Sequence, residues 1–151
     1  MSAYLITHLS LYFLLFSQAF ELVTGDSLFH PKGSEAVSFE EDHIAQIIQL
    51  LGKIPSAIAF SGKYSAQYFN RRGKSPTLLS NLCNTVCFHS GDLRRVGLLR
   101  FWSLYDVLVE KYHFLLEEAF VFSDFLLHML DYYPDRRSTA AQCLHHPWLS
   151  S

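Results

Sequence analysis

Apolar residues between positions 39 and 51 recur with the spacing of an amphipathic helix. One stripe, at i, i+3, i+4 and i+7, is formed by Ile44, Ile47, Ile48 and Leu51. The run Ser38-Phe39-Glu40-Glu41 has the form of a capping box, which predicts that the helix begins at about residue 39. Gly52 is a candidate C-cap, and Pro55 prevents the helix from resuming. We therefore expect a helix over 39–51 with its stripe facing a core.

Two later segments also have helical periodicity. In 104–112 one side of the helix is formed by Leu104, Val107, Leu108 and Tyr112. In 117–130 the apolar positions are Ala119, Phe120, Phe122, Phe125, Leu126, Met129 and Leu130. These positions span a broad arc, so the sequence predicts that this second helix is buried on most sides.

The closing segment, 131–149, carries strong start and stop signals. Pro134 cannot continue a helix, so the preceding helix must end before it. The run from Thr139 to Gln142 has the spacing of a capping box, which predicts a short helix over 139–146. We expect this helix to carry four residues towards a core, namely Ala140, Ala141, Cys143 and Leu144. Trp148 and Leu149 are then left to pack as an apolar clamp.

Residues 1–23 form the most apolar stretch, and three interpretations of it stay open. A signal peptide requires a positive n-region, but the first basic residue is Lys32. A transmembrane helix requires about 20 apolar residues, and this run is interrupted by Thr7, His8, Ser10, Ser17, Gln18 and Glu21. The third interpretation, which we favour, is a buried core helix that ends at a Gly25 C-cap.

The overall pattern is mainly α, with helices only, long loops and no convincing strand alternation. The chain has 151 residues, half of them hydrophobic, which is enough for one domain with a real core. Its net charge of −2 argues against a nucleic-acid binder that works by overall charge. Three cysteines are too few for a disulfide scaffold, so a reducing compartment is expected.

One cluster invites a metal-binding interpretation. Cys83, Cys87 and His89 have the spacing Cys-x3-Cys-x-His within the aperiodic segment 74–90. They supply at most three soft ligands and lack a second ligand pair at zinc-finger spacing. We therefore expect no metal site in this chain, and we interpret His145 and His146 as capping and packing residues.

The closing segment resembles the end of eukaryotic protein kinases. In those enzymes an arginine precedes a Thr-Ala pair, and the helix ends in His-Pro-Trp. The positions that match are Arg137, Thr139, Ala140, Leu144, His146, Pro147 and Trp148. The resemblance assigns structural roles to Arg137 and Trp148. The glutamate that normally pairs with the arginine is missing, so Arg137 is expected to be either solvated or a destabilising buried charge.

A more specific resemblance, to the SR-protein kinases, covers residues 18–73 and 91–150. It is carried by Phe20-Glu21-Leu22, Thr24-Gly25-Asp26, Glu41-Asp42-His43-Ile44-Ala45, Gly62-Lys63-Tyr64-Ser65, Val107 to Tyr112 and Ser123 to Leu127. These serine/threonine kinases use ATP and Mg to phosphorylate arginine/serine-rich segments of splicing factors, and so regulate mRNA splicing. The resemblance implies arginine/serine-rich partners, no direct nucleic-acid contact, and a cytoplasmic and nuclear location. Membrane attachment is expected only if residues 3–23 insert.

The resemblance implies an incomplete large (C-terminal) lobe over 18–150. An apolar segment, 1–17, precedes it, and an insertion, 74–90, interrupts it. The chain contains no Gly-x-Gly-x-x-Gly loop and no Asp-Phe-Gly motif, which a kinase needs to hold ATP and its metal. We therefore expect no catalytic residue and no cofactor site in this chain. The alternative is a non-catalytic docking or decoy module that binds arginine/serine-rich segments.

Four residues match the groove with which SR-protein kinases hold basic substrate segments: Asp26, Asp42, Gln49 and Lys111. Asp42 and Gln49 are seven residues apart, so both lie on the helix face opposite the apolar stripe. An acidic surface there would attract substrate arginines. The simpler interpretation, that these are ordinary surface residues, stays open at this point.

Overall fold

The computed structural model describes residues 16–70, 93–97 and 99–150. They fall into two compact units, one within Phe29–Phe101 and the other within Thr7–Leu28 and Trp102–Ser151. The described residues form helices and loops, with one isolated antiparallel bridge and no strand, which confirms the predicted helical class. Residues 1–15 and the insertion predicted at 74–90, with its Cys83, Cys87 and His89, lie outside the described part of the chain.

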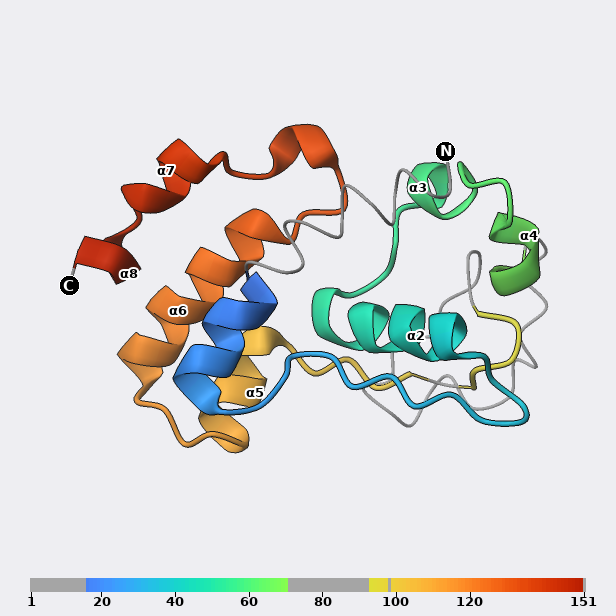
Figure 1. The fold of residues 1–151 in the computed structure, drawn as a ribbon, viewed down its shortest axis with the longest axis horizontal. Helices are drawn as coiled ribbons and strands as arrows, with labels where there is room; N and C mark the ends of the chain where they lie inside the picture. Colours follow the sequence, from blue (N-terminus) through green and yellow to red (C-terminus); the bar gives the residue numbers. More distant parts are fainter. Residues whose placement is uncertain (1–15, 71–92, 98, 151) are drawn as a thin grey trace, which may run out of the picture. The chain divides into compact units, whose positions relative to one another are not determined.

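The first unit is organised around α2, Phe39–Leu51, whose predicted bounds are confirmed (Figure 1). Ser38 caps it by accepting a hydrogen bond from the Glu41 N–H, and Gly52 ends it with φ +82°. Its buried face packs into a core that is built from Ala45, Ile48, Ala59, Phe69 and Leu93. Periodicity thus predicted the helix correctly and its inward face in part. Ile47 and Ile48 are buried as expected, whereas Ile44 and Leu51 are only half-buried.

Two short helices complete this unit: α3, Ser56–Ala59, and α4, Ser65–Tyr68. At four residues each, they give no periodic signal in the sequence. Beyond α4, Phe69 pairs with Leu93 in the antiparallel bridge, and the Arg94 N–H donates to the Tyr68 carbonyl at 2.9 Å. The bridge therefore fixes residues 93–95 beside the end of α4.

The capping box predicted at Ser38 is only half formed. Ser38 accepts from the Glu41 N–H, but the Glu41 carboxylate does not reach back to the cap. It is fully buried, and it accepts hydrogen bonds from the Arg95 N–H at 3.1 Å and from Arg95 Nη1 at 3.5 Å. A buried carboxylate needs such donors, so Glu41 connects α2 to a segment 54 residues away instead of closing its own cap.

In the second unit residues 16–24 are helical, and Phe16 and Phe20 are buried. Gly25 ends this helix with φ +79°, and its N–H donates to the Glu21 carbonyl at 2.8 Å, as the sequence predicts. Within the described residues, no helix is long and apolar enough to span a membrane.

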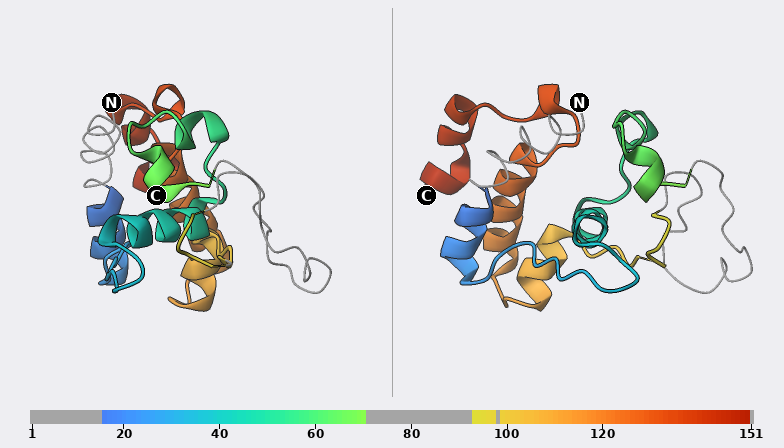
Figure 2. Two further views of the ribbon diagram at one scale, coloured as in Figure 1. Left: turned by 90° about the vertical axis from the view of Figure 1, so that its right-hand side faces the viewer. Right: turned by 45° about the vertical axis from the view of Figure 1, so that its right-hand side comes forward.

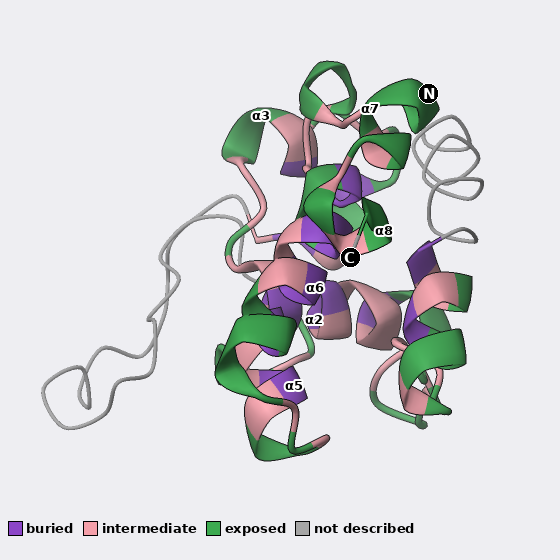
Figure 3. Ribbon diagram, turned by 90° about the vertical axis from the view of Figure 1, so that its left-hand side faces the viewer, coloured by how far each residue is buried: buried purple, intermediate pink, exposed green. Residues whose placement is uncertain are grey.

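The rest of the second unit contains α5, Leu104–Glu110, and α6, Leu116–Met129, which pack on each other (Figures 1 and 2). The prediction that α6 is buried on most sides is wrong, because Phe120 is 64% exposed and Leu127 is 42% exposed. The buried residues of α6 gather on one side (Figure 3). Both α5 and α8 pack on this helix.

The C-terminal segment holds η1, Pro134–Arg136, then α7, Ala140–Leu144, and α8, Pro147–Ser150. The capping box at Thr139 and Gln142 is complete, as predicted. The expectation that α7 carries Ala140, Ala141 and Leu144 into a core is wrong: all three are exposed. Within this segment it is α8 that packs on α6, with the Trp148 ring against those of Phe122 and Phe125.

Candidate functional site

The structure brings Asp26 and Lys111, two residues of the predicted docking site, into direct contact in the second unit. Gly25 turns the chain at the end of helix 16–24 and so places Asp26 just beyond it. Lys111 is the C-cap of α5. Its Nζ lies 3.1 Å from Asp26 Oδ2, and the Tyr112 hydroxyl donates to the same oxygen at 2.8 Å. Asp26, Lys111 and Tyr112 therefore form one hydrogen-bonded surface cluster.

The charges within this cluster balance. Hydrogen bonds to the Tyr112 hydroxyl and then to Asp26 raise the pKa of Lys111, so its ammonium stays charged. Both members of the ion pair are about half exposed, so the pair itself contributes little to stability. Removal of the Asp26 charge alone would leave an unbalanced positive charge, which repels arginine.

Asp42 lies in the first unit and is half-buried on α2, and its carboxylate holds the loop that precedes the helix. Its Oδ2 accepts hydrogen bonds from the Lys32 N–H at 2.9 Å and from Gln46 Nε2 at 3.2 Å. Gln46 Oε1 in turn accepts from the His30 N–H at 2.8 Å. The Asp42 carboxylate therefore stabilises this loop through its Oδ2. Among the described residues, none donates a hydrogen bond to its Oδ1.

Gln49 is half-buried and lies two turns further along α2 on the same face as Asp42. His43 lies beside Asp42, and burial lowers the pKa of its imidazole, although the Asp42 charge acts in the opposite direction. His43 therefore adds little positive charge near Asp42 at neutral pH. The four predicted docking residues are divided between the units, with Asp42 and Gln49 in the first and Asp26 and Lys111 in the second.

Arg137 and Trp148 lie in the C-terminal part of the second unit. Arg137 is half-buried, and its Nε donates to the Asp131 carbonyl at 2.7 Å. The ring of Trp148 lies 4.7 Å from the rings of both Phe122 and Phe125. The predicted clamp is therefore formed by Trp148, whereas Leu149 is exposed.

One surface feature of the first unit was not predicted from the sequence. A wide cleft of about 740 Å³ adjoins the start of α2 and is lined by Ser38, Glu40, Ala66, Gln67, Tyr68, Arg94 and Arg95. Both arginines already donate to protein groups, Arg94 Nε to the Phe69 carbonyl and Arg95 to Glu41. The cleft depends on the bridge between Phe69 and Leu93, and these residues are too far apart in sequence for local patterns to pair them.

The chain is similar to several curated protein kinases. It is 49% identical over 132 residues to SRSF protein kinase 3 from Mus musculus, and 43% identical over 130 residues to serine/threonine-protein kinase SKY1 from Saccharomyces cerevisiae. Protein kinase dsk1 from Schizosaccharomyces pombe is 45% identical over 130 residues. No protein-family model matches the chain.

These similarities cover most of the chain but little of each relative. The aligned part is 87% of this chain and 20% of the mouse kinase, and 86% of this chain and 15% of the budding-yeast kinase. The chain therefore spans about a fifth or less of the length of these two kinases.

Proposed function

We propose that this chain is the end of a kinase large lobe. The premise is that the chain is homologous to part of the SRSF protein kinases and related serine/threonine kinases. We infer further that it binds arginine/serine-rich protein segments and transfers no phosphate. The observation that carries the proposal is the 43–49% identity along almost the whole chain. An incomplete large lobe also agrees with the helical character of the described residues.

The absence of catalysis in the proposal rests on the chemistry of phosphoryl transfer. That reaction depends on groups that hold ATP, position its metal ions and orient the substrate hydroxyl. The sequence contains neither a Gly-x-Gly-x-x-Gly loop nor an Asp-Phe-Gly motif. A bound peptide would therefore meet no group that positions a γ-phosphoryl.

The binding part of the proposal rests on Asp26 and Asp42. Arginine guanidinium can donate two parallel hydrogen bonds to a carboxylate. Asp42 Oδ2 is already bonded to the Lys32 N–H, so an arginine would add its bond at Oδ1. At Asp26 an arginine must compete with Lys111. Because exposed charge pairs contribute only about 0–1 kcal/mol each, the affinity is expected to be weak.

Binding of a labelled Arg-Ser repeat peptide by the full chain tests this proposal. Asp26→Asn and Asp42→Asn should each weaken binding about two- to fivefold, and Gln49→Glu should strengthen it by a similar factor. Asparagine at position 42 keeps an oxygen for the Lys32 N–H, so the loop is preserved while the charge is removed. Binding should also weaken with added salt, because the Debye length is about 8 Å at physiological ionic strength.

The matched control is Asp135→Asn, since Asp135 is an exposed acid in η1 outside the predicted site. It should leave the affinity unchanged. If all four variants and the unmodified chain bind the peptide with equal affinity, these residues are only a solvated surface. The same conclusion follows if the affinity does not change with salt concentration.

A further inference from the structure

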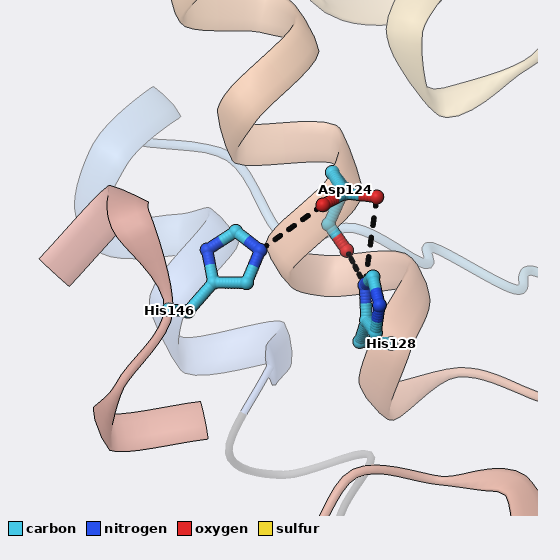
Figure 4. Close-up of side chains that lie close together, drawn as sticks. All are labelled: Asp124, His128 and His146. Carbon is cyan, nitrogen blue, oxygen red and sulfur yellow. Dashed lines mark hydrogen bonds and ion pairs between the residues drawn. The ribbon is translucent and has the colours of Figure 1, made fainter. Parts of the chain in front are cut away.

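Asp124, His128 and His146 meet at the junction of α6 with the turn between α7 and α8 (Figure 4). Each offers one ligand atom of a type that binds transition metals, and these atoms lie within 4.8 Å of one another. Asp124 and His128 are one helical turn apart on α6, so their side chains share a face. His146 approaches Asp124 from the other side (Figure 4). We propose that these three residues bind a divalent late transition-metal ion of the Zn²⁺ class.

The distances fit a small coordination sphere. His146 Nε2 lies 3.1 Å from Asp124 Oδ2, and His128 Nδ1 lies 3.5 Å from Asp124 Oδ1. Bonds of about 2.0–2.1 Å in a tetrahedral zinc site place neighbouring ligand atoms about 3.3 Å apart. The two measured separations lie on either side of that value. No two of the three ligand atoms are more than 4.8 Å apart, so side-chain rotations within this cluster would direct all three at one ion.

Packing positions the least exposed ligand before any ion arrives. The side chain of His146 is only 12% exposed, and its ring lies 5.2 Å from the ring of Phe125. Its Nδ1 accepts a hydrogen bond from the Trp148 N–H at 3.2 Å. The other two ligands are about half exposed, so solvent can supply a water as the fourth ligand.

Metal binding requires a change of tautomer at both rings. A backbone N–H only donates, so His146 Nδ1 is an acceptor and the Nε2 proton of the neutral ring points at Asp124. His128 Nδ1 lies 2.8 Å from the Asp124 carbonyl, so its proton is on Nδ1. On binding, each proton moves to the other nitrogen of its ring, and the hydrogen bond from Trp148 is lost. Coordinate bonds to the ion then take the place of the hydrogen bonds that the two rings make to Asp124, whereas the hydrogen bond from Trp148 is not replaced.

The donor set selects the class of ion. Two imidazoles and one carboxylate favour Zn²⁺, Cu²⁺, Ni²⁺ or Co²⁺ over Mg²⁺ and Ca²⁺, which prefer oxygen ligands. The sequence did not predict this cluster, because His146 follows His128 by 18 positions and its motif suggested a helix end. Only the packing of α8 on α6 brings the two rings together.

Titration of the full chain with Co²⁺, followed by its visible absorption bands, tests the site. The Cys83→Ser/Cys87→Ser chain serves as background, so that thiolates at these positions cannot contribute. We expect saturable bands of a four-coordinate ion, displaced by Zn²⁺ but not by Mg²⁺. His128→Gln should weaken Co²⁺ binding at least about tenfold. Because His128 is half exposed, this variant should fold, as thermal melts without metal would verify.

The matched control is His145→Gln, which removes an exposed histidine next to the cluster and should leave the Co²⁺ affinity unchanged. Zn²⁺ should also raise the melting temperature of the control chain but not of the His128→Gln chain. Equal Co²⁺ affinity in the two variants would overturn the site. So would the absence of Co²⁺ bands, or bands that disappear when Cys83 and Cys87 are replaced.

Discussion

Replacement of Phe122 by alanine is expected to lower the free energy of unfolding by about 3–5 kcal/mol. Phe122 is only 1% exposed, and its ring lies 4.7 Å from the ring of Trp148 and 6.4 Å from that of Phe114. The substitution removes the burial of a large apolar side chain and leaves a cavity between α6 and α8. It also removes aromatic pairs, each of which contributes about 0.5–1.5 kcal/mol beyond burial.

Phe120→Ala is the matched control, with the same chemical change two residues earlier on the same helix. Phe120 is 64% exposed, so the free energy of unfolding should change by no more than about 0.5 kcal/mol. Urea unfolding followed by far-UV circular dichroism measures both variants. Equal losses at the two positions would contradict the assignment of the buried side of α6.

The second large effect is expected at Glu41. Glu41→Ala should cost about 2–3 kcal/mol, because it removes a fully buried carboxylate that accepts a hydrogen bond from the Arg95 N–H. The side chain of Arg95 is more than half exposed, so water can solvate its charge once the partner is gone. The expected loss of stability therefore comes mainly from the Arg95 N–H, which is left without its acceptor, and from the cavity left by the Glu41 side chain.

Glu40→Ala provides the comparison for that variant. Glu40 is exposed on the first turn of the same helix, so its replacement should change the free energy of unfolding by about 0.5 kcal/mol or less. Hydrogen exchange at the Arg95 amide should accelerate in Glu41→Ala and stay slow in Glu40→Ala. Similar exchange rates in the two variants would show that the buried carboxylate does not hold this segment.

Local signals in the sequence were sufficient to predict the helices themselves and where they end. The glycine C-caps at Gly25 and Gly52 and the capping box at Thr139 each involve neighbours within about two turns, and the structure confirms each of them. The helix over 39–51 is confirmed too, although only two residues of its predicted stripe, Ile47 and Ile48, are buried. Such features depend on helical geometry alone, which short sequence spacings determine.

Features that depend on distant partners could not be predicted in the same way. Glu41 looked like part of a capping box because its real partner, Arg95, is 54 residues away. The sequence did not predict the exposed side of α6, because composition does not say which neighbouring elements cover a helix. The pairing of Asp26 with Lys111 spans 85 residues, and only the resemblance to SR-protein kinases placed both residues at one site.

The proposal that this chain transfers no phosphate is tested most directly by the mass of the peptide. An Arg-Ser repeat peptide is incubated with the purified full chain and MgATP, and its intact mass is then recorded. We expect an unmodified peptide, because the sequence contains neither a Gly-x-Gly-x-x-Gly loop nor an Asp-Phe-Gly motif. Phosphorylated peptide in proportion to the amount of chain, in a preparation free of other kinases, would contradict the account.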